Sequence, residues 1–252
     1  MTNLTGFERA HYVQKIFTRI ATSYDLMNRL MTFGQDLRWR REVIYRAAPP
    51  INGLLLDLGA GTGDLALETI RQFPSCQVIA ADFTLDMMKI GISRGFKFLS
   101  SLKNSLNVSI APTTPKSLPY WSVGDALNLP FPNEAFDAVV SGFLLRNLSD
   151  ITNALSEQYR VLKSGGKLIV LDASQPRHNI LYPFINLYLH TVIPFMGRLL
   201  VGEIEAYTYL PDSIKHFLSA EQLTAHLVNV GFKAVGFRSL NFGTIAIHCG
   251  LK

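Results

Sequence analysis

The segment Leu55 to Asp64 (LLDLGAGTGD) constrains the fold of this chain more than any other part of it. A short continuous apolar run leads into glycines at alternate positions, Gly59, Gly61 and Gly63, and a helical pattern follows. Glycine permits a tight turn and a close approach of the backbone to a ligand. The free N–H groups at the start of the next helix favour a polar or anionic partner. The sequence therefore predicts a strand–turn–helix unit with a ligand at its turn.

The rest of the chain repeats this alternation of strand and helix. Short continuous apolar runs lie at 77–81, 139–140 and 167–171, and helical patterns at 85–95 and 151–162 lie between them. Continuous rather than alternating apolar strands indicate a parallel sheet that is covered on both faces. We therefore expect an α/β fold with a doubly wound, mostly parallel sheet.

Further segments surround this core in what we expect to be a single domain. Helical patterns at 7–22 and 34–48 predict an N-terminal helical region. Two strand-like runs joined through Asn241-Phe242-Gly243 predict an antiparallel C-terminal hairpin. A stretch rich in Ser, Pro, Thr and Asn, residues 99–119, reads as a surface loop. The predicted regions are 1–50 (N-terminal helices), 51–176 (ligand-binding core), 177–216 (apolar cap) and 217–252 (C-terminal helix and hairpin).

The predicted cap is nearly long enough to span a membrane. Between Arg177 and Arg198 there is no Asp, Glu, Lys or Arg, and a bilayer needs about 20 apolar residues. However, Pro183, Asn186 and Pro194 interrupt the stretch, and freed polar groups are costly in a lone span. The segment is therefore expected to be a buried or surface-facing apolar cap.

Composition and charge narrow the class of protein. A hydrophobic content of 48% excludes a disordered chain, and a formal charge of +5 is too small to indicate nucleic-acid binding. Residues 1–50 carry +4 of that charge, which fits either a face for anionic lipid or a solvated helix face. Cys76 and Cys249 show neither metal-ligand nor disulfide spacing, which fits a reducing cytosol, and no metal is expected. The polar and charged start predicts no signal peptide.

Polar groups follow several of the predicted strands, where ligands of parallel sheets bind. Asp82 fits the ribose hydroxyls of a nucleoside, or alternatively an N-cap. Asp125 and the Ala126 N–H fit an adenine, although a loop aspartate also caps its own turn. Asp64 stands where the nicotinamide fingerprint requires a small residue. The predicted cofactor contacts are Asp57, Gly59, Ala60, Gly61, Thr62, Gly63, Asp82, Phe83, Asp125, Ala126 and Ser141.

The compact glycine turn is similar to that of S-adenosylmethionine-dependent methyltransferases. Over nearly its whole length the chain resembles the menaquinone and ubiquinone biosynthesis C-methyltransferases. The most specific shared elements are Tyr24 to Asn28 (YDLMN), Leu145-Arg146-Asn147 (LRN) and Tyr207 to Leu210 (YTYL). The chain departs from the family pattern at three positions. The family usually has glycine where this chain has Leu144, proline where it has Ser164, and a proline soon after Phe217, where this chain has Leu218.

This resemblance implies a seven-stranded class I fold, S-adenosylmethionine as cofactor, and methyl transfer to a ring carbon of a reduced, prenylated quinone. Arg146 would stabilise a phenolate and organise a water, and Asn147 would orient that water. Tyr24 would either close over the methionine end of the cofactor or contact the substrate. A naphthoquinone ring is favoured over a benzoquinone. Tyr207, Tyr209 and His216 would contact the ring or relay a proton. Alternatively, they are buried polar groups that are hydrogen-bonded to the backbone.

Other readings remain at this stage. The acceptor is alternatively another small lipophilic molecule, and two more distant possibilities are a nicotinamide-dependent reductase and a non-catalytic scaffold. The apolar cap and the basic N-terminal helices predict a cytoplasmic protein that associates peripherally with the inner face of the membrane to collect its substrate. No nucleic-acid partner is expected, and a homodimer is left open.

Overall fold

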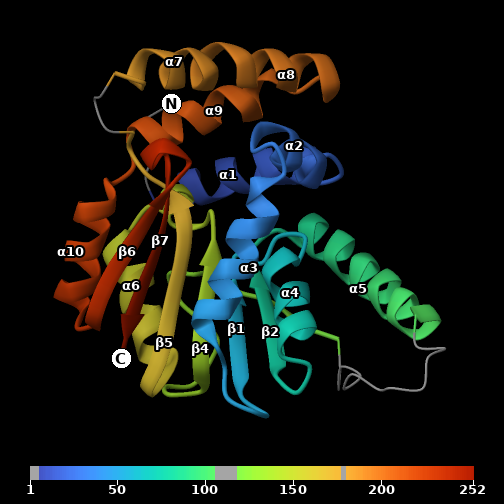
Figure 1. The fold of residues 1–252 in the computed structure, drawn as a ribbon, viewed down its shortest axis with the longest axis vertical. Coiled ribbons are helices and arrows are strands. Elements are labelled where there is room, and N and C mark those ends of the chain that lie inside the picture. The colour runs from blue at the N-terminus through green and yellow to red at the C-terminus, as the bar shows by residue number, and fades with distance from the viewer. Residues whose placement is uncertain (1–5, 106–117, 177–179) are drawn as a thin grey trace.

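The computed structural model describes residues 6–105, 118–176 and 180–252. A seven-stranded sheet with the strand order β3-β2-β1-β4-β5-β7-β6 forms its centre (Figure 1). The strands are β1 (Leu54–Leu58), β2 (Gln77–Asp82), β3 (Tyr120–Val123), β4 (Phe136–Gly142), β5 (Leu162–Ala173), β6 (Lys233–Leu240) and β7 (Ile245–Leu251).

The sheet is mostly parallel, as predicted. Strands β1 to β5 pair in parallel, whereas β7 runs antiparallel between β5 and β6. The turn Asn241–Gly243 joins β6 to β7, which confirms the C-terminal hairpin. Strand β5 is longer than the apolar run at 167–171. It begins at Leu162, directly after the helix Ile151–Val161, and continues to Ala173.

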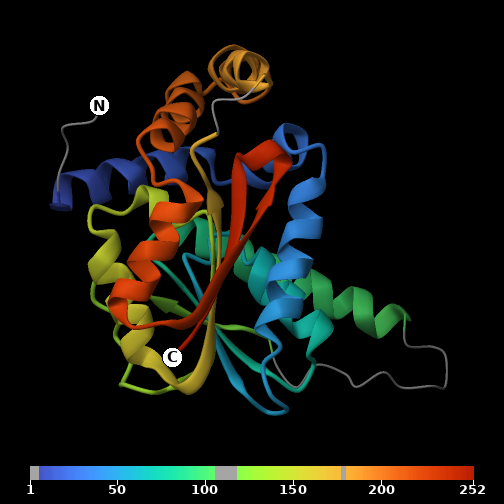
Figure 2. The same ribbon diagram turned by 60° about the vertical axis from the view of Figure 1, so that its left-hand side comes forward.

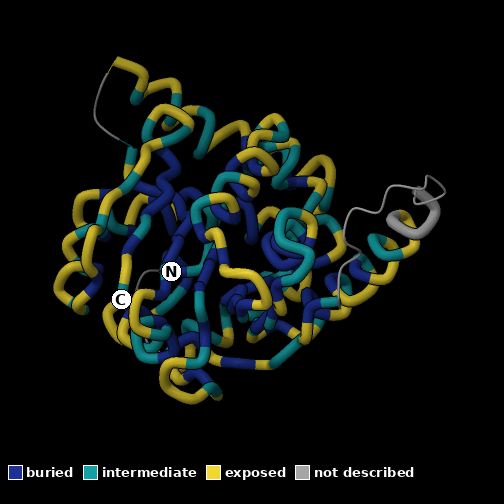
Figure 3. The backbone as a smooth tube through the Cα atoms, turned by 60° about the horizontal axis from the view of Figure 1, so that its bottom comes forward, coloured by how far each residue is buried: buried dark blue, intermediate teal, exposed yellow. Residues whose placement is uncertain are grey.

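Helices cover both faces of the sheet, which explains why its strands are continuous apolar runs. On one face lie α3 (Gln35–Ala47), α4 (Asp64–Gln72) and α5 (Leu85–Ser105), and on the other lie α6 (Ile151–Val161) and α10 (Ala220–Val230) (Figure 2). The two corresponding apolar clusters use alternate residues of the same strand, such as Leu55 and Leu56. Figure 3 shows this buried interior beneath an exposed outer layer.

Two predictions from the sequence need correction. Helix α5 continues to Ser105, so residues 99–105 are helical rather than part of a loop, and the rest of that predicted loop up to residue 117 lies outside the described residues. The segment Tyr24–Met31 forms a separate helix, α2, which the periodicity did not reveal. Its eight residues are too few for a clear helical repeat.

The predicted cap is helical and packs on the N-terminal helices. It consists of α7 (Tyr182–Leu187), a π-helical turn η2 (Tyr188–Val192), α8 (Ile193–Leu200) and α9 (Ile204–Lys215). The turn precedes Pro194, which has no N–H to continue the α-helical ladder. In the described parts of the chain, no helix is both long enough and apolar enough to cross a bilayer.

A third apolar cluster joins this cap to α1 (Gly6–Ile20) and α2. Ile16, Ile20 and Met27 of the N-terminal helices pack there against Ile193 and Tyr207 of the cap. Together these helices lie over the carboxyl ends of the parallel strands (Figure 1). Segments from the two ends of the sequence therefore roof the edge of the sheet where ligands of α/β folds bind.

Candidate active site

A cavity of about 120 Å³ lies under this roof, at the carboxyl ends of β1, β2 and β4. Its floor includes Gly59 and Gly61, and helix α1 closes it from above with Ala10, Val13 and Gln14. The Gln14 side-chain amide donates a hydrogen bond to the carbonyl of Phe83, 2.9 Å away, which fixes α1 to the cavity wall. Predicted cofactor or catalytic residues that line this cavity are Tyr24, Gly59, Gly61, Asp82, Phe83, Asp125, Ala126 and Asn147.

The glycine turn needs its glycines for conformation. Gly59 and Gly61 have φ of 67° and 55°, a region that residues with a Cβ rarely adopt. A Cβ at Gly59 would also lie 2.8 Å from a methyl carbon of Leu144. Leu144, which stands where the resembling family has glycine, thus packs directly on the turn and forms part of the cavity wall.

Asp82 both caps local structure and lines the cavity. Its carboxylate accepts hydrogen bonds of 2.7 Å from the N–H groups of Gly61 and Thr84, so it ties the glycine turn to the start of α5. Burial raises the pKa of Asp82, and these backbone donors counteract that rise. Asp82 thus orders the backbone just before α5 without being its N-cap residue, and its position in the cavity leaves ribose binding as a prediction.

The carboxylate of Asp125 is bonded within its own loop. One oxygen accepts a hydrogen bond of 2.9 Å from the N–H of Leu127. Asp125, Ala126, Leu127 and Phe83 nevertheless all line the same part of the cavity. Carboxylates suit ribose hydroxyls and an exocyclic amine, while the Phe83 ring offers a stacking surface for adenine. This set of groups fits an adenosyl ligand.

Of the residues predicted for catalysis, Tyr24 and Asn147 line this cavity, and Arg146 lies next to Asn147 in the chain. Arg146 and Asn147 belong to a 3-10 turn, η1 (Leu145–Asn147), just after β4. Asn147 Nδ2 donates to the carbonyl of Phe143 at 3.0 Å, and the hydroxyl of Tyr209 donates to Asn147 Oδ1 at 3.1 Å. Tyr24 belongs to α2. Residues from three distant segments of the chain, around 24, 143–147 and 209, therefore lie near one another.

Arg146 is held by a partner that sequence reasoning missed. Its Nη1 lies 2.8 Å from Asp172 Oδ1 in a buried ion pair, and Asp172 stands near the end of β5. Its guanidinium also lies over the Phe143 ring, 5.2 Å from the centroid. The rule that identified Asp82, an acid that closes a buried apolar strand, would also have found Asp172.

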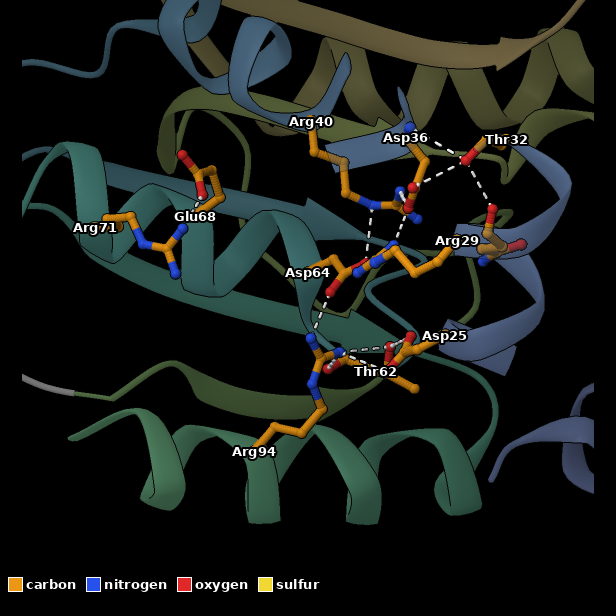
Figure 4. Close-up of polar contacts among 11 residues, drawn as sticks. Asp25, Arg29, Thr32, Asp36, Arg40, Thr62, Asp64, Glu68, Arg71 and Arg94 are labelled. Atoms are coloured by element: carbon orange, nitrogen blue, oxygen red, sulfur yellow. Dashed lines mark hydrogen bonds and ion pairs between the residues drawn. The ribbon is translucent and has the colours of Figure 1, made fainter. Parts of the chain in front are cut away.

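A network of charges attaches the N-terminal helices to the glycine turn (Figure 4). Asp64, the first residue of α4, contacts Arg29 at 2.9 Å, Arg40 at 3.1 Å and Arg94 at 2.6 Å. Burial alone would raise the pKa of Asp64, but the attraction of these guanidiniums outweighs burial and lowers it. Asp64 occupies the position that excluded a nicotinamide fingerprint, and here it serves as an ionic anchor.

The same network extends to two further acids. Arg29 and Arg40 both bind Asp36, which is fully buried. Arg94 binds Asp25 at 2.9 Å, and the hydroxyl of Thr62 donates to Asp25 at 2.7 Å. Three carboxylates and three guanidiniums from α2, α3, α4 and α5 therefore neutralise one another beside the glycine turn.

Several predicted site residues lie outside the cavity lining. Asp57 is buried and accepts a hydrogen bond of 2.9 Å from the N–H of Ala66, so it joins β1 to α4. Tyr207 packs in the cap cluster, and His216 follows α9 with Nδ1 2.8 Å from the carbonyl of Asp212. The other predicted residues outside the lining are Ala60, Thr62, Gly63, Ser141, Arg146 and Tyr209.

The fold and this site together define the class of protein. A seven-stranded sheet of this order, with a glycine turn and acidic residues at its strand ends, is the fold of class I S-adenosylmethionine-dependent methyltransferases. Solved structures agree on the fold. The [4+2]-cyclase SpnF matches with a TM-score of 0.65 at 17% identity, covering 95% of this chain and 94% of that one. A methyltransferase of Thermotoga maritima, described as a possible histamine N-methyltransferase, matches with a TM-score of 0.62 at 19% identity, covering 94% and 99%.

The chain belongs to the ubiE/COQ5 methyltransferase family, whose model matches residues 5–252. It is 41% identical over 240 residues to a ubiquinone/menaquinone biosynthesis C-methyltransferase of Desulfotalea psychrophila, covering 95% of this chain and 90% of the relative. It is 40% identical over 235 residues to a demethylmenaquinone methyltransferase of Thermus thermophilus, covering 93% and 99%. The family resemblance, the class of enzyme and the cofactor expected from the sequence are confirmed.

Asp57 gives a prediction on pH dependence. Burial raises its pKa to about 7, above the value near 4 expected when unfolded. An acid with a raised folded pKa stabilises the fold at low pH, and this contribution is lost as the pH rises from about 4 to about 7. Relative to Asp57→Asn, wild-type stability should therefore fall across that window and level off above it. Urea unfolding of both proteins from about pH 4 to pH 8 measures this difference.

Asp137→Asn provides the matched control with the opposite sign. Burial raises the pKa of Asp137, but Lys163 and the N–H of Leu54 outweigh it and the net shift is downward. The stability advantage of wild type over Asp137→Asn should be present above about pH 4 and lost below it. An unchanging difference between wild type and Asp57→Asn over the whole range would show that Asp57 does not titrate in the folded protein as described.

Proposed function

We propose that this C-methyltransferase of quinone biosynthesis converts demethylmenaquinol to menaquinol, by methylation of a ring carbon of the reduced, prenylated naphthoquinone. The names of the Thermus thermophilus relative and of a Roseiflexus relative, 37% identical over 245 residues, support the naphthoquinone ring. The name of the Desulfotalea psychrophila relative also includes ubiquinone biosynthesis, so a benzoquinol is the alternative acceptor.

The observation that carries the proposal is the state of Arg146. Its side chain is 7% exposed, and Nη1 is bound to Asp172, but in the described part of the chain the buried Nε has no hydrogen-bond partner. A buried N–H donor without a partner is costly. An oxyanion of the acceptor ring would satisfy it with a charge-assisted hydrogen bond.

The reaction then needs the following from the protein. S-adenosylmethionine, when bound, would supply an electrophilic methyl group on its sulfonium, and the sulfur would leave as a neutral thioether. The quinol hydroxyl loses its proton to water, which makes the neighbouring ring carbon nucleophilic. Once the new carbon–carbon bond has formed, the hydrogen of that ring carbon leaves as a proton to water and the ring is aromatic again. Arg146 stabilises that oxyanion but does not take the proton, because its guanidinium is always charged. Asn147, held by Tyr209, orients the acceptor or a water, and Tyr24 covers the methyl-donor end.

Replacement of Arg146 should separate turnover from cofactor binding. Arg146→Ala is expected to lower kcat about 100-fold or more and to leave the Kd for S-adenosylmethionine near that of wild type. Arg146→Lys, which keeps a positive charge beside Asp172 but lacks Nε, should lose nearly as much activity. Calorimetric titration with the cofactor and a methyl-transfer assay measure the two effects, and loss of cofactor binding would assign Arg146 to the cofactor instead.

The choice of ring is tested directly. The enzyme is incubated with S-adenosylmethionine and either a reduced demethylated naphthoquinone or the corresponding benzoquinol, each with the same prenyl tail. Mass analysis of the products should show a methyl group added to carbon of the naphthoquinol at the higher kcat/KM. Preference for the benzoquinol would select the alternative, and methylation of neither would contradict the proposal.

We further propose that the cap takes its substrate from a membrane surface. Large apolar side chains of the cap are exposed to solvent. They include Ile180 (88% exposed), just before α7, Phe184 (70%) on α7, and Phe195 and Leu199 on α8. We call these four residues the apolar cap face. Arg29 and Arg40 are engaged with acids, so apolar surface rather than those charges supports this contact.

Cosedimentation with phospholipid vesicles tests the membrane contact. Wild type should sediment with anionic vesicles at low salt and be released by alkaline wash, and the double variant Phe184→Ser/Phe195→Ser should bind at least about tenfold more weakly. Phe96→Ser is the control, because Phe96 is similarly exposed (60%) but lies on α5. No binding of wild type, or equal loss with Phe96→Ser, would refute the proposal.

A further inference from the structure

A second and larger cavity, of about 400 Å³, lies beneath α7 and the turn η2. Its walls come from α2, the cap and the turn between β6 and β7. Apolar side chains predominate in the lining, among them Met31, Ile185, Leu189 and Ile193. Covering this apolar lining removes it from water, so an apolar ligand is favoured.

The two cavities share a wall. Phe143, the residue after β4, lines both of them. Its backbone has φ of 61°, a conformation that is strained for a residue with a bulky side chain, and its N–H donates to the carbonyl of Leu171 at 2.7 Å. The guanidiniums of Arg146 and Arg40 lie over its ring at 5.2 and 5.6 Å from the centroid. These contacts hold Phe143 at the boundary between the cavities.

Arg146 is one of the polar residues in the lining of the larger cavity, which also include Asn28, Thr32, Asp36, Asn241 and Thr244. It lines that cavity and not the smaller one, and its buried Nε is unpartnered in the described part of the chain. The lining also includes Leu181 and Phe184, and Phe184 belongs to the apolar cap face. The lining thus holds both a buried hydrogen-bond donor and part of the exposed apolar surface.

We infer that this larger cavity binds the first isoprene units of the acceptor's prenyl tail, with a ring oxygen at Arg146 and the distal tail leaving beneath α7 at the apolar cap face. This inference rests on the proposed function, because it assumes a prenylated quinol. A single amphipathic molecule with a polar head and an apolar tail matches this lining. Because Phe143 lines both cavities, the acceptor ring at Arg146 would lie next to the smaller cavity, which we call the donor cavity.

Narrowing the cavity should impair only acceptors that carry a tail. Ile185→Trp adds bulk to the cavity wall from α7, and Asn186→Trp, an exposed neighbour that does not line the cavity, is the matched control. The acceptors are a demethylated naphthoquinol with a short prenyl tail and one with no tail, assayed without vesicles. We expect Ile185→Trp to raise KM about tenfold or more for the tailed acceptor and to leave the tail-less acceptor unchanged.

A binding measurement that does not depend on turnover accompanies the assay. Calorimetry with the oxidised, tailed naphthoquinone should show a similar loss of affinity in Ile185→Trp but not in Asn186→Trp, while affinity for S-adenosylmethionine stays the same in both. Because a tryptophan could prevent α7 from packing, Ile185→Asn is tested as well. It introduces a polar group without added bulk and should weaken binding of the tailed quinone selectively.

The outcomes separate this inference from the proposed function. If both acceptors are affected equally, or if neither Ile185 variant affects the tailed acceptor, the tail does not lie in this cavity, although the methylation itself stands. If wild type methylates neither the tailed nor the tail-less naphthoquinol, the proposed function fails and the inference fails with it.

Discussion

The ion pairs of Asp64 attach helices α2, α3 and α5 to the start of α4, beside the glycine turn. Asp64 begins the helix that follows the glycine turn, and it meets one arginine from each of the three helices α2, α3 and α5. A single buried carboxylate could not compensate three guanidiniums, but Asp25 and Asp36 balance the charge. Removing one member of such a buried network costs far more than a surface ion pair would contribute, because the remaining charges stay buried.

This network fixes the position of the helices that cover the site, because α2 belongs both to the network and to the apolar cluster of the cap. With α2 fixed to the glycine turn, Tyr24 stands over the donor cavity and Met27 reaches the apolar cluster of the cap. The cap therefore packs against a surface whose position is already set by charge. The donor cavity and the larger apolar cavity then share Phe143 as a wall, with Arg146 beside it. The N-terminal helices and the cap, far apart in sequence, thus belong to the same functional unit.

The sequence was most informative where function depends on local backbone. Gly59, Gly61, Asp82 and Asp125 could be predicted as groups beside a ligand because strand ends, turns and helix starts follow one another in the chain, and these four residues line the cavity. Contacts between distant segments left no such signal. Asp172 is recognisable as an acid at a strand end, but nothing in the sequence indicates that Arg146 is its partner. Likewise, nothing near Gln14 indicates that α1 closes the cavity. Asp57 shows the converse limit, because its place in the motif suggested a ligand contact while its carboxylate instead bonds Ala66.

A crystal structure with the product S-adenosylhomocysteine tests the central claim most directly. We expect its adenosine between the glycine turn and Phe83, its ribose at Asp82, and its sulfur toward Phe143 and Tyr24, where the acceptor ring would meet it. If the nucleoside instead occupied the larger cavity beneath α7, or if the sulfur pointed away from Phe143, the arrangement of donor and acceptor described for this enzyme would be contradicted.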